Sequence, residues 1–477
     1  MLATADLFTQ LNDYQKEAVL DDSPALMLNA HVGSGKTTVL ISKVLYLSLE
    51  KNVDLEDMVV LTFTNKAADE IKERLMRAKP DLEEKDMPHV GTLHGVASKL
   101  LRDVLPVEEL GYTSDFSIME PDEVEDMANR LIIEHGFDIK YKNKLILRLG
   151  HVKNGRTLFG NMRREDDIVK LWDKLKEEKI EQNKMDFDDL ILNATTLLAE
   201  HPIDPKWIII DEFQDSDPSQ LEFIKAMESP DTKLFVVGDP NQVIYSWRGS
   251  DSNILEKFKE EFQAKAMSLP INYRSSSTIL EVANHFLSDE PDLEGIRQEG
   301  SKIIVKNHHG AFNEAQYIAD RIKSLRKEGL NYSDIAVFYR LQRQARPLED
   351  VFQREQIPFE VSLKKSLKDF PVLHWFVNLL KASLNEKDKN NVIATLHNKK
   401  FGEGLTLKRI KKIIDGKETS LLYEKIKRFP DWCKQHTTAD ILDIYDYFDL
   451  DDYLAPTSAE YMENKSLIID FLTAMQI

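Results

Sequence analysis

A glycine-rich segment reads Leu28-Asn29-Ala30-His31-Val32-Gly33-Ser34-Gly35-Lys36-Thr37-Thr38. It follows an apolar run, Ala25–Leu28, so the pattern predicts a strand, a tight loop and a helix in that order. Backbone N–H groups of such a loop, with the positive end of the helix, surround a phosphate. Lys36 would then reach the β- and γ-phosphate oxygens, and the Thr37 hydroxyl would take a Mg²⁺ position. The segment therefore predicts a nucleoside triphosphate site.

A second apolar run, Trp207–Ile210, ends in Asp211 and Glu212. This pattern predicts a buried strand that delivers two carboxylates at its carboxyl end. Asp211 would hold Mg²⁺ and Glu212 would orient the attacking water. The competing interpretation is the acid-rich start of an ordinary helix. The glycine loop upstream favours the first interpretation.

Composition limits the classes of protein that the chain can belong to. Its 477 residues are enough for two to four domains, and 42% hydrophobic with 30% charged residues is typical of a globular protein. The net charge of −19 argues against polyanion binding over the whole surface, so any nucleic-acid contact must be local. Cys433 is the single cysteine, which excludes an internal disulfide and a multi-thiolate metal site. We expect a cytoplasmic protein without a membrane segment, because no apolar run has spanning length and no signal pattern opens the chain.

One local exception to the acidic composition lies between residues 140 and 164. Tyr141 and Phe159 are interleaved with its basic residues, and no acidic residue intervenes. This combination suits neutralisation of a nucleic-acid backbone with occasional base stacking. A solvated helical face is an equally good interpretation of these residues alone. The basic island consists of Lys140, Lys142, Lys144, Arg148, Lys153, Arg156, Arg163 and Arg164.

The order of apolar runs predicts the fold class. Amphipathic helical stretches separate these runs, which is the α/β pattern of a parallel sheet. The pattern becomes wholly helical between about 107 and 184, and again after 370, so we predict two sheet domains, each with a helical insertion. The predicted strands are 25–29, 58–63, 207–210, 234–237, 302–305 and 335–339.

Seven segments in a fixed order give the chain a resemblance to a known family, the UvrD/Rep/PcrA group of superfamily 1 DNA helicases. The resemblance extends over nearly the whole chain and implies two RecA-like P-loop domains with all-α insertions. The segments are Leu11–Val19, Thr62–Ala68, Gly91–Gly95, Asp186–Leu190, Asp211–Asp215, Val237–Gly249 and Asn272–Ser275.

The resemblance implies ATP and Mg²⁺ as cofactors and assigns their contacts. Gln15 would read the adenine edge, since its amide donates and accepts at once. Tyr273 would stack on the adenine, and Gln242 would sense the γ-phosphate and report it to the DNA groove. Arg274 would stabilise charge on the transferred phosphoryl group, although an arginine paired with a helix acid is the alternative. The implied cradle is Gly33, Ser34, Gly35, Lys36, Thr37 and Thr38, and the implied catalytic residues are Glu212, Arg274, Gln242 and Lys36.

The resemblance also implies a DNA-binding set. Bases stack on aromatic rings without regard to sequence, so Trp247 with Tyr245 and Phe63 forms the expected platform. Core packing is the alternative, which the polar neighbours of Trp247 disfavour. His94 would touch a DNA phosphate or serve as a local hydrogen-bonding residue. The full set is Thr62, Phe63, Thr64, Asn65, Thr92, His94, Tyr245, Trp247 and Arg248.

We expect the chain to have four parts. A first RecA-like domain consists of 1–106 and 181–262, and a helical insertion with the basic island lies between them at 107–180. A partial second RecA-like domain follows at 263–370, and a second helical insertion at 371–477. The last part has a basic patch that suits duplex DNA or a solvated face equally well. That patch is Lys399, Lys400, Lys408, Arg409, Lys411 and Lys412.

The sequence departs from the family pattern at three places. His31 stands where relatives usually have glycine, and Thr38 replaces an arginine. A Thr-x-His-x-Ala-Lys-Gly-Leu-type motif and a later arginine motif are missing, so we expect the second RecA-like domain to be incomplete. Three explanations stay open: a fragment of a longer helicase, a short protein completed by a partner chain, or a nucleotide-gated DNA-binding protein that has lost unwinding.

The resulting expectation is an ATP-dependent DNA helicase or translocase acting on single-stranded DNA and single-/double-strand junctions, with 3′-to-5′ movement implied by the resemblance. Repair, replication and defence all use such a motor. An unrelated P-loop ATPase or nucleotide kinase would share the cradle but not the Gln242 segment. An inactive scaffold subunit would not need Lys36, Asp211, Glu212 and Arg274 together.

Replacing Trp247 by alanine tests the stacking platform. We expect Trp247→Ala to keep basal ATP turnover and to lose most of its stimulation by single-stranded DNA, because each stacked base contributes about 1–3 kcal/mol. Steady-state ATP hydrolysis with and without single-stranded DNA measures both quantities. Undiminished stimulation in the variant would contradict the assignment.

Overall fold

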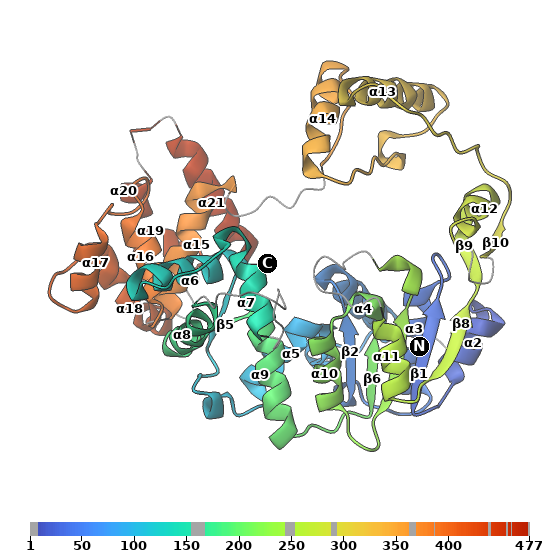
Figure 1. The fold of residues 1–477 in the computed structure, drawn as a ribbon, viewed down its shortest axis with the longest axis horizontal. Helices are drawn as coiled ribbons and strands as arrows, with labels where there is room; N and C mark the ends of the chain where they lie inside the picture. Colours follow the sequence, from blue (N-terminus) through green and yellow to red (C-terminus); the bar gives the residue numbers. More distant parts are fainter. Residues whose placement is uncertain are drawn as a thin grey trace. The chain divides into compact units, whose positions relative to one another are not determined.

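The computed structural model describes residues 8–153, 167–243, 253–287, 293–361, 369–385, 387–436, 440–454, 457–458 and 460–475 (Figure 1). The chain divides into two compact units. The first consists of Met1–Gln298 with Pro371–Ile477, and the second is Glu299–Phe370. The division into four parts that the sequence suggests stays a prediction.

A six-stranded parallel sheet forms the centre of the first unit, in the order β3-β2-β6-β7-β1-β8 (Figure 1). The predicted strands at 25–29, 58–63, 207–210 and 234–237 are confirmed as β1, β2, β6 and β7. Near-continuous apolar runs are typical of parallel strands that are buried on both faces. The strands are β1 Ala25–Ala30, β2 Met58–Thr62, β3 Val90–Thr92, β6 Trp207–Ile210, β7 Lys233–Gly238 and β8 Lys265–Leu269.

Helices cover both faces of this sheet, and alternate strand residues divide between two cores. Met27 and Ile208 pack with the helices of one face, whereas Leu28 and Ile209 pack with those of the other. The first face carries α5 Leu93–Asp103, α9 Phe187–Glu200, α10 Pro218–Met227 and α11 Ile254–Glu261, and the second carries α2 Asp13–Leu20, α3 Lys36–Leu49 and α4 Asn65–Ala78.

β8 is an addition that the sequence did not predict. It pairs with β1, with Met27 opposite Ala266, although it lies beyond residue 262, where we placed the end of the first sheet domain. Only its last residue, Leu269, is buried, and the sequence missed the strand because Lys265-Ala266-Met267-Ser268 lacks the apolar run of a central strand. An edge strand of this kind is fixed by its neighbour and not by its own hydropathy.

The segment predicted to be wholly helical also contains a short strand. Its helices are α6 Pro121–His135, α7 Leu145–Lys153 and α8 Ile168–Glu181. β4 Ser117–Met119 precedes them and pairs in parallel with β5 Lys184–Asp186, so the prediction was wrong at these residues. Three residues are too few to show a period in the sequence, and the pairing joins positions far apart in the chain.

The helical prediction after residue 370 is confirmed. In the basic patch, Arg409 and Lys412 both form ion pairs with Glu418. The Arg409 Nε and Lys412 Nζ atoms lie 3.1 and 2.8 Å from its carboxylate. Lys400 pairs with Glu460 at 2.6 Å. These pairs fit the interpretation as a solvated face. The helices are α15 Pro371–Leu384, α16 Lys389–His397, α17 Leu407–Ile414, α18 Leu421–Gln435, α19 Asp443–Tyr447, α20 Leu450–Tyr453 and α21 Tyr461–Met475.

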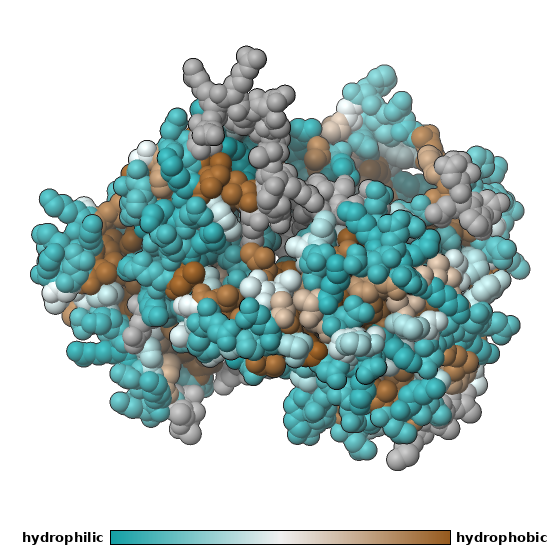
Figure 2. All heavy atoms as spheres, turned by 60° about the horizontal axis from the view of Figure 1, so that its bottom comes forward, coloured by the Kyte–Doolittle hydropathy of each residue, from teal (hydrophilic) through white to brown (hydrophobic). Residues whose placement is uncertain are grey.

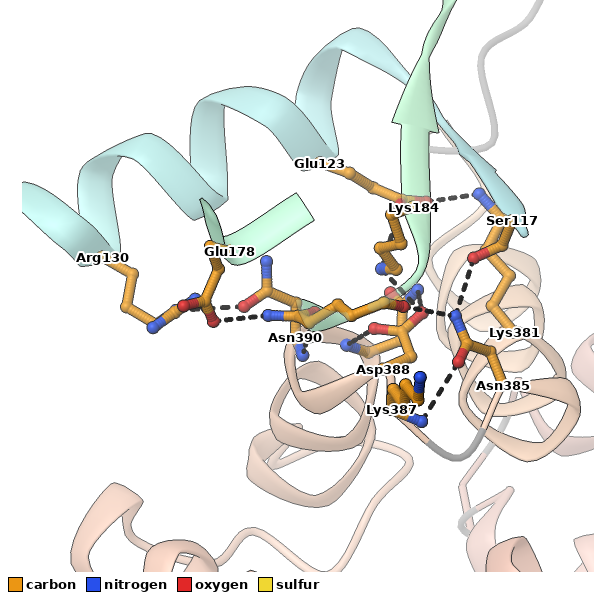
Figure 3. A network of polar contacts seen from close by, with 12 residues as sticks. Ser117, Glu123, Arg130, Glu178, Lys184, Lys381, Asn385, Lys387, Asp388 and Asn390 are labelled. Carbon is orange, nitrogen blue, oxygen red and sulfur yellow. Dashed lines mark hydrogen bonds and ion pairs between the residues drawn. The ribbon is translucent and has the colours of Figure 1, made fainter. Parts of the chain in front are cut away.

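A buried polar network joins these C-terminal helices to β4, β5 and α6 (Figure 3). Lys184 Nζ lies 2.6 Å from Asp388, and both side chains are at most 1% exposed. Asn385 Nδ2 donates to Ser117 Oγ at 3.0 Å, and Arg130 Nε donates to Asn390 Oδ1 at 3.0 Å. Charges this deeply buried need their partners, since an unpaired one carries a large desolvation cost.

The second unit has a small core between α13 Ala311–Lys327 and α14 Ala345–Arg354. The strands predicted at 302–305 and 335–339 are not formed, so these two predictions were wrong. Ile335 and Val337 pack on the core, whereas Phe338 is 93% exposed. The alternation is that of a strand with one buried face, but a strand also needs a hydrogen-bonded neighbour. A hollow of about 860 Å³ lies beside this segment.

Figure 2 shows hydrophilic side chains over most of the face it presents, with apolar ones in small patches. This agrees with the strongly acidic composition. Across the part of the chain that the structure describes, no helix combines the length and apolarity that crossing a membrane requires.

Removing one partner of the buried ion pair tests its contribution. We expect Asp388→Asn to lower the free energy of unfolding by about 3–5 kcal/mol, because the buried Lys184 charge then keeps only its longer contact of 3.5 Å with Glu123. Lys389→Gln is the control, since it breaks an exposed pair with Glu181 and is expected to cost about 1 kcal/mol or less. Urea denaturation measures both, and equal losses would contradict the expectation.

Candidate active site

The glycine loop lies at the carboxyl end of β1 and leads into α3. Gly33 and Gly35 have φ angles of +66° and +85°, a left-handed backbone that glycine adopts without strain. A Cβ atom at Gly33 would lie 2.7 Å from Asn272 Nδ2, and one at Gly35 would lie 2.9 Å from Gln15 Nε2. Both positions therefore favour glycine for conformation, and at Gly33 the Arg274 Cβ atom, which would lie 2.9 Å from the added atom, leaves no space for a side chain either.

β9, Ile271–Ser276, packs directly against this loop. The Tyr273 N–H donates to the Gly33 carbonyl at 2.9 Å, and Asn272 Nδ2 donates to the Val32 carbonyl at 2.6 Å. Asn272 Oδ1 accepts from the Arg274 N–H at 2.9 Å. The structure thus brings Tyr273 and the exposed Arg274 beside the loop. Sequence reasoning missed the role of Asn272, although it opens one of the seven segments.

Gln15 ties helix α2 to the same loop. Its Nε2 donates to the Ser34 carbonyl at 2.9 Å, and its Oε1 accepts from the Asn12 N–H at 3.0 Å. Asn12 Nδ2 in turn donates to the Tyr273 hydroxyl at 2.5 Å. A glutamine amide has two donor hydrogens on its nitrogen and two lone pairs on its oxygen. The contacts of Gln15 use one hydrogen and one lone pair, so the second hydrogen and the second lone pair can bond to the edge of a base.

The two predicted carboxylates follow β6. Lys36 Nζ lies 2.9 Å from Glu212 Oε2, with side chains 11% and 37% exposed. Asp211 is buried, and burial together with the charge of Glu212 raises its pKa to about 7. Burial and Glu212 also raise the pKa of Asp215, to about 6. A buried carboxylate with a disfavoured charge is one that a cation would stabilise.

These residues fit a Mg²⁺–nucleotide complex. Asp211 and Thr37 offer oxygen atoms, the ligands that Mg²⁺ prefers. The Ser34 hydroxyl is buried, and among the described residues it has no hydrogen-bond partner. Thr38 is exposed in the first turn of α3, and His31 is half-buried with its carbonyl accepting from the Ser34 N–H at 3.1 Å.

Gln242 lies just beyond β7, in the short turn Pro240–Gln242. Its Nε2 donates to Asp239 Oδ2 at 2.6 Å, and Asp239 is buried at the strand end. Residues 244–252 lie outside the described part of the chain, so the predictions for Tyr245, Trp247 and Arg248 are untested.

The remaining predicted DNA contacts lie at the carboxyl ends of β2 and β3. Thr62 and Thr92 are opposite each other in the parallel ladder. Thr62 Oγ1 donates to the Thr64 carbonyl at 3.0 Å, and Thr64 and Thr92 cap α4 and α5. His94 makes an edge-on contact with Phe187, with ring centroids 5.6 Å apart. Phe63 is half-buried, whereas Thr64 and Asn65 are exposed. Their binding role stays a prediction.

The basic island is only partly described. Arg148 is buried and donates to the Lys140 carbonyl, which is a structural use of its guanidinium. Tyr141 is 58% exposed. Residues 154–166, which include Arg156, Phe159 and the last two arginines of the island, lie outside the described residues.

The sequence matches two family descriptions, each over one part of the chain. Residues 11–263 match "UvrD/REP helicase N-terminal domain", and residues 267–470 match "UvrD-like helicase C-terminal domain". The chain belongs to the UvrD/REP helicase family. The predicted family and its P-loop α/β fold class are thereby confirmed.

Curated relatives agree with this membership. A "DNA helicase II" of Haemophilus influenzae is 30% identical over 387 residues, which is 76% of this chain and 52% of the relative. A "Probable DNA helicase II homolog" of Mycoplasma capricolum is 29% identical over 76% of this chain and 53% of the relative. An "ATP-dependent DNA helicase PcrA" of Staphylococcus aureus is 27% identical over 83% and 57%. The chain spans about half the length of these relatives.

The raised pKa of Asp211 gives a test in magnesium-free buffer. Between its unfolded pKa near 3.8 and its folded pKa of about 7, the folded protein binds more protons, so stability falls as pH rises. We expect Asp211→Asn to remove this part of the pH dependence and to melt several degrees higher than the wild type above pH 7.

Thermal denaturation across this pH range measures the effect. Asp231→Asn, at an exposed carboxylate, is the control and should follow the wild type. Added Mg²⁺ should raise the melting temperature of the wild type and not that of Asp211→Asn. An unchanged pH slope in Asp211→Asn would contradict the assignment.

Proposed function

We propose that the chain is an ATP-dependent DNA helicase or translocase that couples DNA-stimulated ATP hydrolysis to binding of single-stranded DNA. The observation that carries this proposal is the Lys36–Glu212 ion pair at 2.9 Å, on a glycine loop that β9 covers with Arg274. Family membership supports it. The three relatives above are named as DNA helicases, and the proposed setting is the cytoplasm.

The proposed hydrolysis uses side chains that already face one another. When a nucleotide enters, its phosphate oxygens attract Lys36 away from Glu212, which is then free to orient the attacking water. Arg274 stabilises the negative charge that develops on the transferred phosphoryl group. Thr37 and Asp211 would hold Mg²⁺, which neutralises phosphate charge when bound. Gln15 and Tyr273 place the adenine.

The proposed coupling to DNA runs through the end of β7. Gln242 follows this strand by a few residues and directly precedes the segment with Tyr245, Trp247 and Arg248. The ends of β2 and β3 present Thr64, Asn65 and His94 at the same edge of the sheet. Single strands and strand junctions are the proposed substrates, and 3′-to-5′ movement is the proposed direction.

A second candidate is a nucleotide-gated DNA-binding subunit that needs a further polypeptide segment for unwinding. The observation that favours it is the segment 335–339 in the second unit, which alternates half-buried and exposed residues and is paired with no strand among the described residues. A segment with this alternation suits pairing with a strand of another chain. In this candidate, a protein partner completes the ATP site.

Two substitutions separate binding from hydrolysis. We expect Lys36→Ala to lower ATP turnover by about 10²–10³-fold through lost phosphate contacts. Glu212→Gln should retain nucleotide binding and lose turnover to a similar degree. Steady-state hydrolysis with and without single-stranded DNA, together with fluorescent-nucleotide titration, measures both effects. Lys51→Ala, at an exposed lysine beyond α3, is the control.

Three results distinguish the candidates. ATP turnover that single-stranded DNA stimulates supports the motor. Nucleotide-dependent DNA binding without strand separation supports the second candidate. A protein that ignores Mg·ATP altogether would contradict both.

A further inference from the structure

A buried glutamine lies beside the predicted water-orienting carboxylate. Gln214 belongs to the short turn Phe213–Asp215 that follows β6, and it is 1% exposed. Its Nε2 donates to Glu212 Oε2 at 2.8 Å, and its Oε1 accepts from the Asp239 N–H at 3.0 Å. One amide thus joins the catalytic carboxylate to the backbone at the end of the neighbouring strand.

The fit around this amide is close. A Cβ atom at Gly238, the last residue of β7, would lie 3.1 Å from Gln214 Oε1 and 3.0 Å from Leu255 Cδ2. A side chain at position 238 would therefore require the Gln214 amide or Leu255 to shift by a few tenths of an ångström. Because Gly238 has no side chain, the Gln214 amide has space to accept from the Asp239 N–H.

Glu212 has an unfavourable backbone conformation, so hydrogen bonds to its carboxylate are important for the orientation of that carboxylate. Its φ angle is +50°, a left-handed conformation that is unfavourable for a residue with a side chain. Its carboxylate oxygen Oε2 receives two donors, Lys36 Nζ at 2.9 Å and Gln214 Nε2 at 2.8 Å. These two groups hold the carboxylate in the nucleotide-free protein.

The two donors differ in what a nucleotide does to them. Lys36 is attracted to phosphate oxygens, whereas Gln214 is buried and anchored to Asp239. We infer that Gln214 is a positioning residue that keeps the Glu212 carboxylate in place for water activation after Lys36 has moved to the phosphates. The inference rests on the proposed function and deepens it.

The chemistry of the position explains why glutamine suits it. The side chain must donate to a carboxylate and accept from a backbone N–H at once, which an amide does and a carboxylate or thioether does not. Asp239, whose N–H the amide fixes, also accepts from Gln242 through its side chain. Glu212 and Gln242 are therefore both held through the same turn at the end of β7.

Two variants with ATP as the probe test the inference. We expect Gln214→Met, which has similar volume and neither hydrogen bond, to lower kcat by about 10–100-fold while KM for ATP and affinity for Mg·ADP change less than about twofold. Gln214→Glu keeps the acceptor for Asp239, and its carboxyl can donate to Glu212 only while it is protonated. Relative to the wild type, its kcat should therefore fall toward that of Gln214→Met as the pH rises.

Gln220→Met is the matched control. Gln220 is also buried, and its Oε1 accepts from the Asp217 N–H at the start of α10, away from Glu212. We expect this variant to keep the wild-type kcat. Melting temperatures of all three variants show whether each is folded.

The outcomes separate the inference from the function on which it rests. A wild-type protein without ATP turnover would overturn the proposed function itself. With an active wild type, unchanged kcat in Gln214→Met would overturn the inference. A kcat in Gln214→Glu that stays at the wild-type level and does not fall as the pH rises would overturn it as well, because the Asp239 contact alone would then be sufficient. An equal loss in Gln220→Met would show a general effect of packing and would also contradict it.

Discussion

The contact between Lys36 and Glu212 joins the glycine loop to the carboxylates, and it exists because the order of the strands brings their carboxyl ends together. The glycine loop follows β1 and the carboxylates follow β6, and β7 lies between these strands in the sheet. Neighbouring strands are about 4.8 Å apart, so the ion pair spans two such steps across the end of β7. Both side chains reach because they extend from the same carboxyl edge. The arrangement depends on the parallel order β6-β7-β1 more than on any single residue.

The Lys36–Glu212 ion pair is weak enough for Lys36 to exchange Glu212 for the phosphate groups of a nucleotide. The lysine is 11% and the glutamate 37% exposed, and partly exposed pairs contribute about 1 kcal/mol or less to stability. The phosphate groups of a nucleotide carry more negative charge than one carboxylate. Lys36 can therefore leave Glu212 and bind the phosphates with little loss of free energy from the broken ion pair. The pair keeps both side chains oriented toward the site until that exchange. Contacts that must survive the exchange are the buried ones, as at Asn272 and Gln15.

Sequence reasoning succeeded where the signal was local. The strands β1, β2, β6 and β7 are continuous apolar runs, and the glycine loop and the carboxylates are adjacent to two of them. The placement of Tyr273 and Arg274 beside the loop came from the resemblance, because nothing in residues 271–276 alone points to a contact more than 230 positions away. The roles assigned to these residues stay predictions.

The failures share one physical cause, which is that pairing is a property of two segments. β4 and β8 are strands because a neighbour pairs with them, although their own sequences are short or polar. Residues 335–339 have the alternation of a strand, but no other described segment pairs with them, and they are not assigned as a strand. Asn272 and Gln214 were missed for a similar reason. Their importance lies in hydrogen bonds to distant backbone groups, which composition and spacing do not reveal.

The acidic composition constrains how DNA would be held. A protein with a net charge of −19 repels a polyanion at long range, so contact at short range must overcome this repulsion. The basic island contributes less than its residue count suggests, because the Arg148 guanidinium is buried against the Lys140 carbonyl. At the sheet edge, α4 and α5 both begin at the ends of adjacent strands. Helix N-termini favour anions through backbone N–H groups without adding charged side chains. A surface of this kind would hold a strand mainly by short-range contacts, and its affinity would then depend on salt less steeply than that of a lysine-rich groove.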